Sequence, residues 1–166
     1  MGRKAKCIYD SIYHCYSAMM EKLFQVHTPA DFLSIIELIF KQADHQVPLV
    51  IALTGDLGAG KTAFTQELGK FLGVSEPIVS PTYTLMKQYS LNHDFYQELV
   101  HIDAYRIESE DEIGPLHLET VLNKPKTIIC IEWPEMISAV IPKGAINLSI
   151  NIIEGENREV RISRLD

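Results

Sequence analysis

The sequence has few cysteines and no long apolar segment, and each shortage excludes a class of protein. Cys7, Cys15 and Cys130 form neither a C-x-x-C pair nor zinc-finger spacing, so we expect no disulfide framework and no structural metal site. The one sizeable apolar run, Leu49–Leu53, is far shorter than the roughly 20 residues of a membrane helix. The sequence therefore predicts a soluble protein of the reducing cytoplasm, without a membrane partner.

Basic residues are also in short supply. Fifteen Lys and Arg stand against 22 Asp and Glu, which gives a formal net charge of -7. A protein that grips nucleic acid by neutralising many phosphates needs a concentrated basic face. The composition argues against a DNA-binding protein, and any role in RNA chemistry is expected to be indirect.

The rest of the composition is that of an ordinary globular domain. With 46% apolar and 22% charged residues in a chain of 166, we expect one domain with one core, over residues 21–166. Residues 1–20 start with a basic stretch but lack the clean apolar region of a secretion signal. They are interpreted as an N-terminal extension of unknown role, or as an artefact of start-site choice with Met20 as the true first residue.

Strand and helix patterns alternate along most of the domain. A short strand at Leu23–Val26 precedes a helix that starts near Thr28, and the unbroken apolar run Leu49–Leu53 is typical of a parallel strand covered on both faces. Helical spacing predicts a helix over Lys61–Leu72. Further strands are expected at Tyr83–Tyr89, Leu99–Ile102, Thr127–Ile131, Ala145–Ile153 and Glu159–Ile162. The predicted fold class is α/β, with a mainly parallel central sheet flanked by helices and a C-terminal antiparallel hairpin across residues 154–157.

The segment between the buried strand and the next helix matches the pattern G-x-x-x-x-G-K-[ST] in full, as Gly55-Asp56-Leu57-Gly58-Ala59-Gly60-Lys61-Thr62. Glycines let the backbone curl until several amides point inward, and the helix start adds its positive dipole, so that a triphosphate fits there. Lys61 is placed to reach the outer phosphates, and the Thr62 hydroxyl to take one position on Mg²⁺. A single P-loop NTPase domain is therefore predicted. The alternative without a binding function is a Gly-rich turn that ends in a helix cap.

A nucleotide site also needs acids near the metal, and in a parallel sheet these lie at the carboxyl ends of the strands, beside the loop. Two predicted strands end in an acid, because Asp103 follows Leu99–Ile102 and Glu132 follows Thr127–Ile131. Either carboxylate could contact Mg²⁺ directly or through water, or could be a plain solvated acid.

Four segments together carry a family resemblance. They are the loop at 55–62, Ser80-Pro81-Thr82-Tyr83-Thr84-Leu85, His101-Ile102-Asp103-Ala104-Tyr105-Arg106 and Ile131-Glu132-Trp133-Pro134. In this order and spacing they resemble the TsaE family, also called YjeE, the bacterial ATPases needed to make threonylcarbamoyladenosine (t6A) in tRNA. The likeness extends from about Leu23 to the C-terminus.

The resemblance implies a small ATPase that acts with two partner proteins, TsaD and TsaB, and meets tRNA indirectly through that complex. TsaD carries the transfer chemistry in this family. ATP and Mg²⁺ are the implied cofactors, and hydrolysis is expected to be weak until the partners are present.

The resemblance also implies roles for individual residues. Lys61, Asp103 and Glu132 would be catalytic, and Thr62 and Glu132 would hold Mg²⁺. The implied nucleotide contacts are Thr28, Asp56, Leu57, Gly58, Ala59, Gly60, Lys61, Thr62, Ala63, Thr82 and Arg158. The segment Ser80–Thr82 would act as a switch-like loop that senses the outer phosphate.

Several of these residues have structural alternatives. Trp133, the only Trp, could be a large core side chain, and Ser80–Thr82 could be turn residues. Arg158 could be one more charge of the hairpin. Arg106 is interpreted as one half of a structural ion pair, and His101 as a satisfied interior histidine.

Other protein classes share the phosphate loop. A small-molecule kinase commonly closes an Arg-bearing lid, but the sequence has no Arg between Ile107 and Asn157. A GTPase typically selects guanine with N-K-x-D, and the nearest match, Asn123-Lys124-Pro125-Lys126, lacks the carboxylate. Adenine is therefore favoured. A nucleotide-dependent scaffold that hydrolyses nothing is the third alternative.

Overall fold

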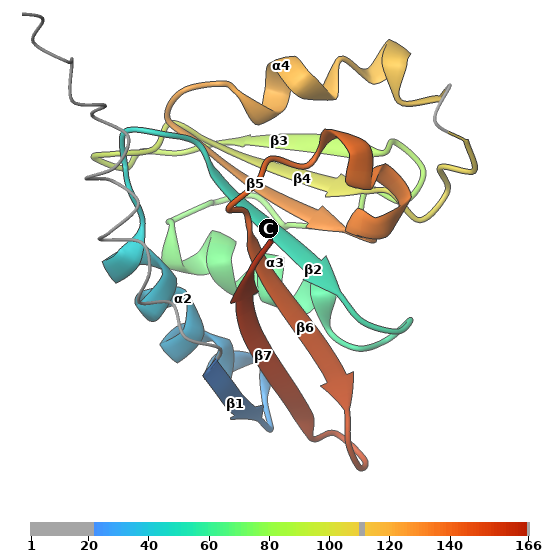
Figure 1. The fold of residues 1–166 in the computed structure, drawn as a ribbon. Helices are drawn as coiled ribbons and strands as arrows, with labels where there is room; N and C mark the ends of the chain where they lie inside the picture. Colours follow the sequence, from blue (N-terminus) through green and yellow to red (C-terminus); the bar gives the residue numbers. More distant parts are fainter. Residues whose placement is uncertain (1–21, 110–111, 166) are drawn as a thin grey trace, which may run out of the picture.

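Seven strands form one mixed sheet in the computed structural model, which describes residues 22–109 and 112–165 (Figure 1). The strands are β1 (Lys22–Val26), β2 (Leu49–Thr54), β3 (Met86–Ser90), β4 (Glu98–Asp103), β5 (Thr127–Glu132), β6 (Ile146–Ile152) and β7 (Arg158–Arg164). Their order across the sheet is β1-β7-β6-β2-β5-β4-β3. The N-terminal extension predicted at residues 1–20 lies outside the described residues.

Parallel pairing is confined to the centre of the sheet. β2 pairs parallel with both β5 and β6, and β4 pairs parallel with β5. β1 and β7 on one side, and β3 on the other, are joined antiparallel. The predicted hairpin of the last two strands is present, with Ile152 opposite Arg158. The α/β class with a parallel centre is therefore confirmed, and antiparallel strands extend the sheet at both edges.

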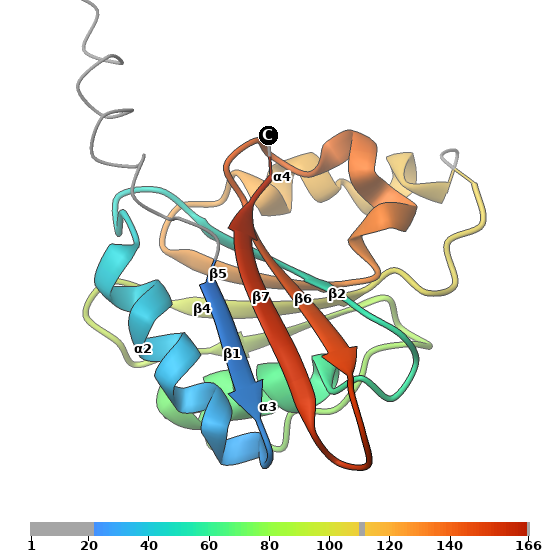
Figure 2. The same cartoon turned by 60° about the horizontal axis from the view of Figure 1, so that its bottom comes forward.

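Helices cover both faces of this sheet (Figures 1 and 2). On one face lie α2 (Phe32–Gln42), preceded by the short 3-10 helix η1 (Pro29–Asp31), and α3 (Lys61–Phe71). On the other lie α4 (Leu118–Leu122), preceded by η3 (Gly114–Leu116), and the 3-10 helix η4 (Pro134–Val140). Alternate residues of β2 belong to different cores, because Ile51 packs with the helices of the first face and Val50 with those of the second. Burial on both faces explains the unbroken apolar run of this strand.

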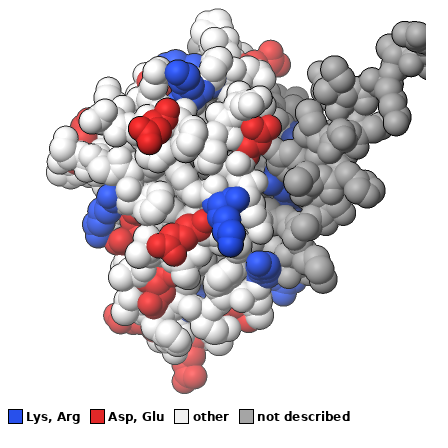
Figure 3. All heavy atoms as spheres, turned by 90° about the vertical axis from the view of Figure 1, so that its left-hand side faces the viewer, with Lys and Arg blue, Asp and Glu red and all other residues white. Residues whose placement is uncertain are grey.

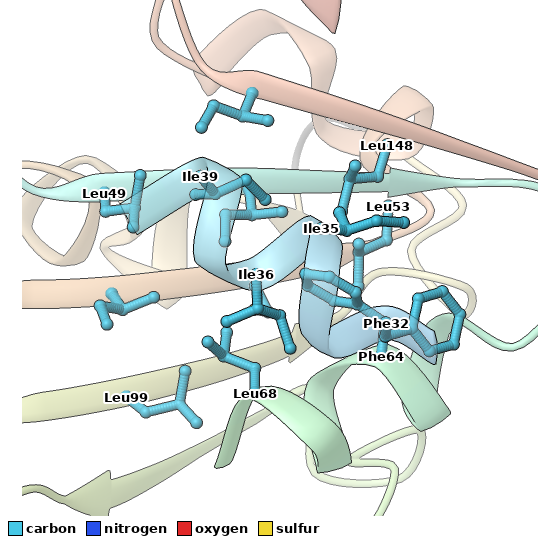
Figure 4. Packing of buried hydrophobic residues seen from close by; sticks show 14 of the residues in the cluster. Phe32, Ile35, Ile36, Ile39, Leu49, Leu53, Phe64, Leu68, Leu99 and Leu148 are labelled. Atoms are coloured by element: carbon cyan, nitrogen blue, oxygen red, sulfur yellow. The ribbon is translucent and has the colours of Figure 1, made fainter. Parts of the chain in front are cut away.

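The helical spacing of apolar residues in α2 places one stripe on the sheet (Figure 4). Phe32, Ile35, Ile36 and Ile39 are each at most 2% exposed. At the start of the helix, the Phe32 ring meets the Phe64 ring of α3 edge to face, with 5.5 Å between their centroids. This contact ties the beginning of α2 to the beginning of α3, where the glycine loop ends.

The strand predicted at Tyr83–Tyr89 begins only at Met86, so its first three residues were wrongly assigned. The backbone turns at Pro81 instead, where the N–H groups of Thr84 and Leu85 both donate to the Pro81 carbonyl, at 2.9 and 2.7 Å. These local bonds replace the ladder bonds that a strand would make. As a result, the segment before β3 stays a loop at the carboxyl end of β4.

Cys130 lies in the middle of β5 with no exposed surface. Burial raises the pKa of its thiol to about 12. A thiol kept neutral in this way is a poor nucleophile and a poor metal ligand. The other two cysteines lie outside the described residues.

Acidic and basic side chains are interspersed over the face that carries α2 (Figure 3). Among the residues described there, Lys and Arg do not gather into the continuous basic surface that a nucleic-acid clamp needs. Across residues 22–109 and 112–165, the helices are too short or too polar to cross a bilayer.

Candidate functional site

The loop between β2 and α3 adopts a conformation that glycine makes possible. Gly55, Gly58 and Gly60 have φ angles of 139°, 79° and 114°, a region that other residues rarely adopt. The Ala59 N–H donates to the Asp56 carbonyl at 3.1 Å, which closes the turn. Gly60 is the N-cap of α3, an 11-residue helix. The loop therefore presents free amides and the positive end of a helix dipole at one point, as an anion site requires.

Gly55 has no room for a side chain. A Cβ there would lie 2.3 Å from the Ile150 carbonyl oxygen of β6. We expect Gly55→Ala to lower the free energy of unfolding by about 2–5 kcal/mol, as the sum of overpacking and an unfavourable backbone conformation. Urea denaturation measures this loss. The matched control is Gly58→Ala, where φ is also positive but nothing lies within 4 Å, and where we expect about 1 kcal/mol. Equal losses in the two variants would contradict the steric argument.

Lys61, the first residue of α3, folds back over the loop. Its Nζ donates to the carbonyl oxygens of Gly55 at 2.6 Å and Asp56 at 2.9 Å. The same Nζ lies 3.9 Å from the centre of the Trp133 ring. Burial lowers the pKa of the Lys61 ammonium below its usual value, and the nearby carboxylates of Glu132 and Glu135 oppose that shift. The ammonium is thus held at the loop by two carbonyls and one aromatic face.

Trp133 packs on the core and also contacts the lysine of the loop. It follows β5 directly, in a left-handed conformation with φ 57°, and it packs at the edge of the core beneath α4 and η4. Its ring also lies 5.1 Å from the Tyr105 ring, centroid to centroid. Trp133 is therefore a partly buried packing residue whose ring contacts the lysine of the loop.

Glu132 meets the hydroxyl of the loop. Thr62 Oγ1 donates to Glu132 Oε1 at 2.7 Å, and the glutamate is 4% exposed. The sheet register explains the meeting, because Glu132 ends β5 directly opposite Leu53 of β2 and opposite Asp103 of β4. The predicted gathering of strand ends at the loop is confirmed.

The donors at this point fit Mg²⁺. One hydroxyl and one carboxylate supply the oxygen ligands that this ion prefers, and Mg²⁺ takes its other ligands from phosphates and water. Among the described residues, no group of three His, Cys, Asp or Glu is arranged to hold a metal by itself. Thr62 and Glu132 can therefore supply part of the coordination of such an ion.

Asp103 is engaged with the loop before β3. Its Oδ2 accepts hydrogen bonds from the hydroxyls of Ser80, at 2.9 Å, and Thr82. Its Oδ1 accepts from the N–H of Tyr105 at 3.1 Å. Asp103 is 3% exposed. The structure thus brings Asp103 and Thr82 together, and it makes this acid the anchor of the Ser80–Thr82 segment.

His101 has a partner that the sequence did not indicate. It is fully buried, as predicted, but only one of its two ring nitrogens is satisfied. Its Nε2 lies 2.8 Å from Glu132 Oε1, whereas its buried Nδ1 has no hydrogen-bond partner among the described residues. The available signal was spacing, since residues 101 and 103 share one face of a strand and Asp103 was already expected at the strand end.

The guanidinium of Arg158 binds backbone carbonyls of the glycine loop. Its Nε donates to the Ala59 carbonyl at 3.0 Å and its Nη2 to the Gly58 carbonyl at 3.5 Å. Arg158 is therefore more than one further charge of the hairpin. The ion pair expected for Arg106 does not form among the described residues, and its guanidinium instead lies 4.4 Å from the centre of the Tyr83 ring.

Thr28 lies on the chain segment beside this hairpin. It follows β1, whose last residue, Val26, pairs with Arg158. Its N–H and hydroxyl both donate to Asp31 Oδ2, at 2.8 and 3.2 Å. The backbone N–H groups of Thr28 and His27 hold the pKa of the Asp31 carboxyl below its ordinary value. The predicted helix start is thus the 3-10 helix η1, and Asp31 holds Thr28 at the N-cap position of that helix.

In this structure a central parallel strand ends in a glycine loop, and a helix follows whose first residues carry an ammonium and a hydroxyl. This is the architecture of the P-loop NTPases. This chain has that fold and that loop. Within the class, it belongs to the TsaE family, because the family model described as "Threonylcarbamoyl adenosine biosynthesis protein TsaE" matches residues 25–161.

Named relatives agree with this assignment, and a solved structure has the same fold. Proteins named "tRNA threonylcarbamoyladenosine biosynthesis protein TsaE" from Rickettsia bellii and Nostoc are 36% and 39% identical to this chain over 115 and 117 residues. Each match covers 69% of this chain, and the matches cover 76% and 69% of the two relatives. The crystal structure of Bacillus subtilis YdiB has the same fold, with a TM-score of 0.69 at 24% identity over 89% of this chain and 87% of that one.

Proposed function

We propose that this protein is the ATPase subunit that supports formation of t6A in tRNA, in the cytoplasm and together with TsaD and TsaB. The observation that carries the ATPase part is the 2.7 Å contact between Thr62 and Glu132 beside the lysine of the loop. The link to tRNA modification rests on membership of the TsaE family. In this proposal the protein meets tRNA only through its partners, since its net charge of -7 does not favour direct binding.

The loop residues bind the phosphates of ATP. Backbone amides of the loop surround the phosphate groups at the start of α3. They belong to Asp56, Leu57, Gly58, Ala59, Gly60, Lys61, Thr62 and Ala63. Lys61 exchanges its carbonyl partners for phosphate oxygens, which a charged donor binds more strongly. Thr62 and Glu132 hold Mg²⁺, which when bound neutralises charge on the outer phosphates.

Asp103 and the Ser80–Thr82 segment form the switch. Both hydroxyls of the segment bind Asp103 in this structure, so either one can turn to an outer phosphate only by leaving that carboxylate. The departure leaves a lone pair of Asp103 Oδ2 that can accept a hydrogen bond from the attacking water. The state of the nucleotide is thereby coupled to the position of a surface loop, which is how a partner could detect it.

Thr28 and Arg158 complete the nucleotide site. Arg158 reaches the loop through Gly58 and Ala59, and the side chain of His27, next to Thr28, lies 2.7 Å from Asn157. The segment just before η1 and the final hairpin therefore meet beside the loop. We assign this corner to the part of ATP that extends beyond the outer phosphates.

The test of this function is the modification itself. Cells that lack the protein are expected to lose t6A, measured by mass spectrometry of digested tRNA, and the wild-type chain should restore it. Single-turnover ATP cleavage with and without TsaD and TsaB distinguishes an ATPase from a scaffold, since we expect cleavage that the partners stimulate. Normal t6A in the deleted strain would refute the assignment.

A further inference from the structure

We propose that His101 is a positioning residue for the metal site: its Nε2–H holds the Glu132 carboxylate in the orientation that Mg²⁺ and Thr62 require. This inference rests on the proposed nucleotide-binding function. It concerns a residue that neither contacts the loop nor lies at a strand end.

The first support is the hydrogen-bond geometry at Glu132. Oε1 lies 2.7 Å from Thr62 Oγ1 and 2.8 Å from His101 Nε2. An ionised carboxylate only accepts hydrogen bonds, so both neighbours must donate, and the His101 proton is therefore at Nε2. The two donors approach one oxygen from α3 and from β4. Together they fix the rotation of the carboxylate, and within residues 22–109 and 112–165 no side chain donates a hydrogen bond to Oε2.

The second support is the cost of placing a histidine at this position. His101 has no exposed surface, and its neighbours in the strand, Val100 and Ile102, are at most 1% exposed. Its buried Nδ1 finds no partner among the residues that the structure describes, which costs free energy that an aliphatic residue of similar size would not incur. Packing alone therefore favours an apolar residue here. Within the described part of the chain, the polar interaction that the histidine side chain makes is the one with Glu132.

The hydrogen bond from His101 matters chemically because side chains that bond to a metal ligand affect how that ligand binds the metal. A donor bonded to a ligating carboxylate orients it before the ion arrives, and its loss typically weakens metal affinity by about 10- to 100-fold. Without His101, the Glu132 carboxylate would be held by Thr62 alone, and that hydroxyl must itself turn to the ion. His101 therefore matters most when Thr62 changes partner.

The experiment compares three variants of the whole chain. His101→Gln keeps an N–H donor at a reach similar to that of Nε2, His101→Asn has a donor with a shorter reach, and His101→Leu has none. Mn²⁺ serves as the probe, and its affinity for the ADP-bound protein is measured by electron paramagnetic resonance. ADP affinity in EDTA and the thermal midpoint are measured on the same samples.

We expect His101→Leu and His101→Asn to weaken Mn²⁺ binding by about tenfold or more, and His101→Gln to remain within about threefold of wild type. ADP affinity in EDTA should not change, because Lys61 and the loop amides are untouched. If His101→Leu does not fold, the contrast between Gln and Asn decides, since both are polar.

Three results would overturn the inference. Wild-type Mn²⁺ affinity in His101→Leu, or in His101→Asn where Leu does not fold, would show that the carboxylate needs no second donor. Mn²⁺ and metal-free ADP binding that fall in parallel with stability would show a merely structural role. If the wild-type chain itself binds no Mn²⁺ with ADP, the proposed nucleotide function fails, and this inference fails with it.

Discussion

Lys61→Ala is expected to lower the affinity for ATP by at least about 100-fold, because a charge-assisted hydrogen bond contributes about 1.5–3 kcal/mol and the lysine makes more than one. In the structure Lys61 is 4% exposed, and two carbonyls hold its ammonium over the loop, at 2.6 and 2.9 Å. It is therefore already at the place where the phosphates enter. Isothermal titration calorimetry measures the loss.

The same helix supplies the control. Lys70, near the end of α3, pairs with Glu67 at 2.6 Å, and its side chain is 71% exposed. Lys70→Ala removes the same charge from the same helix but leaves the loop intact, so ATP affinity should stay within a factor of about two to three. Tight ATP binding by Lys61→Ala would remove the lysine from the phosphate site.

Glu132→Gln is expected to slow Mg²⁺-dependent ATP hydrolysis by about 100-fold or more, in the range found when one preorganised electrostatic group is removed from an active site. The amide keeps an oxygen that can accept from Thr62 and His101, which contact Glu132 at 2.7 and 2.8 Å. The fold should therefore survive, and ATP binding in EDTA should be close to wild type. Phosphate release at saturating Mg²⁺, with the partner proteins present, is the measurement.

A glutamate at the opposite end of the sheet serves as the control for this change. Glu98 begins β4, opposite Thr127 of β5, and bonds to Lys124. Glu98→Gln alters a partly buried strand acid without touching the loop, so turnover should be unaffected. If Glu132→Gln also turns over ATP at the wild-type rate, Glu132 does not hold the metal.

Much of the fold was predictable because its central signals are local. The apolar run of β2, the loop at 55–62 and the helix after it are consecutive in the sequence, and each follows from backbone conformation and side-chain spacing within a few residues. The start of β3 was not predictable in the same way. The residue types at positions 83–85 favour a strand, but the N–H groups of Thr84 and Leu85 bond to the Pro81 carbonyl and form a turn there instead.

Among the site residues too, local features were predictable and contacts between distant residues were not. Arg106 was expected to find an acid, and it instead covers Tyr83, an aromatic ring that is 86% exposed. His101 was expected to be satisfied, and its pairing with Glu132 depends on side chains of two adjacent strands. A partner 31 residues away cannot be read from the composition around a histidine. Contacts between strands are set by register, which the sequence of one strand does not contain.

The amino-acid sequence by itself determined that a phosphate loop precedes a helix and that two later strands end in an acid, since both are properties of neighbouring residues. It left open which of the two acids meets the hydroxyl of the loop. The tertiary structure decided this through strand order, because β5 lies next to β2 whereas β4 is one strand further away. Glu132 of β5 therefore meets Thr62, from which it is separated by 70 residues, and Asp103 of β4 binds the Ser80–Thr82 loop instead.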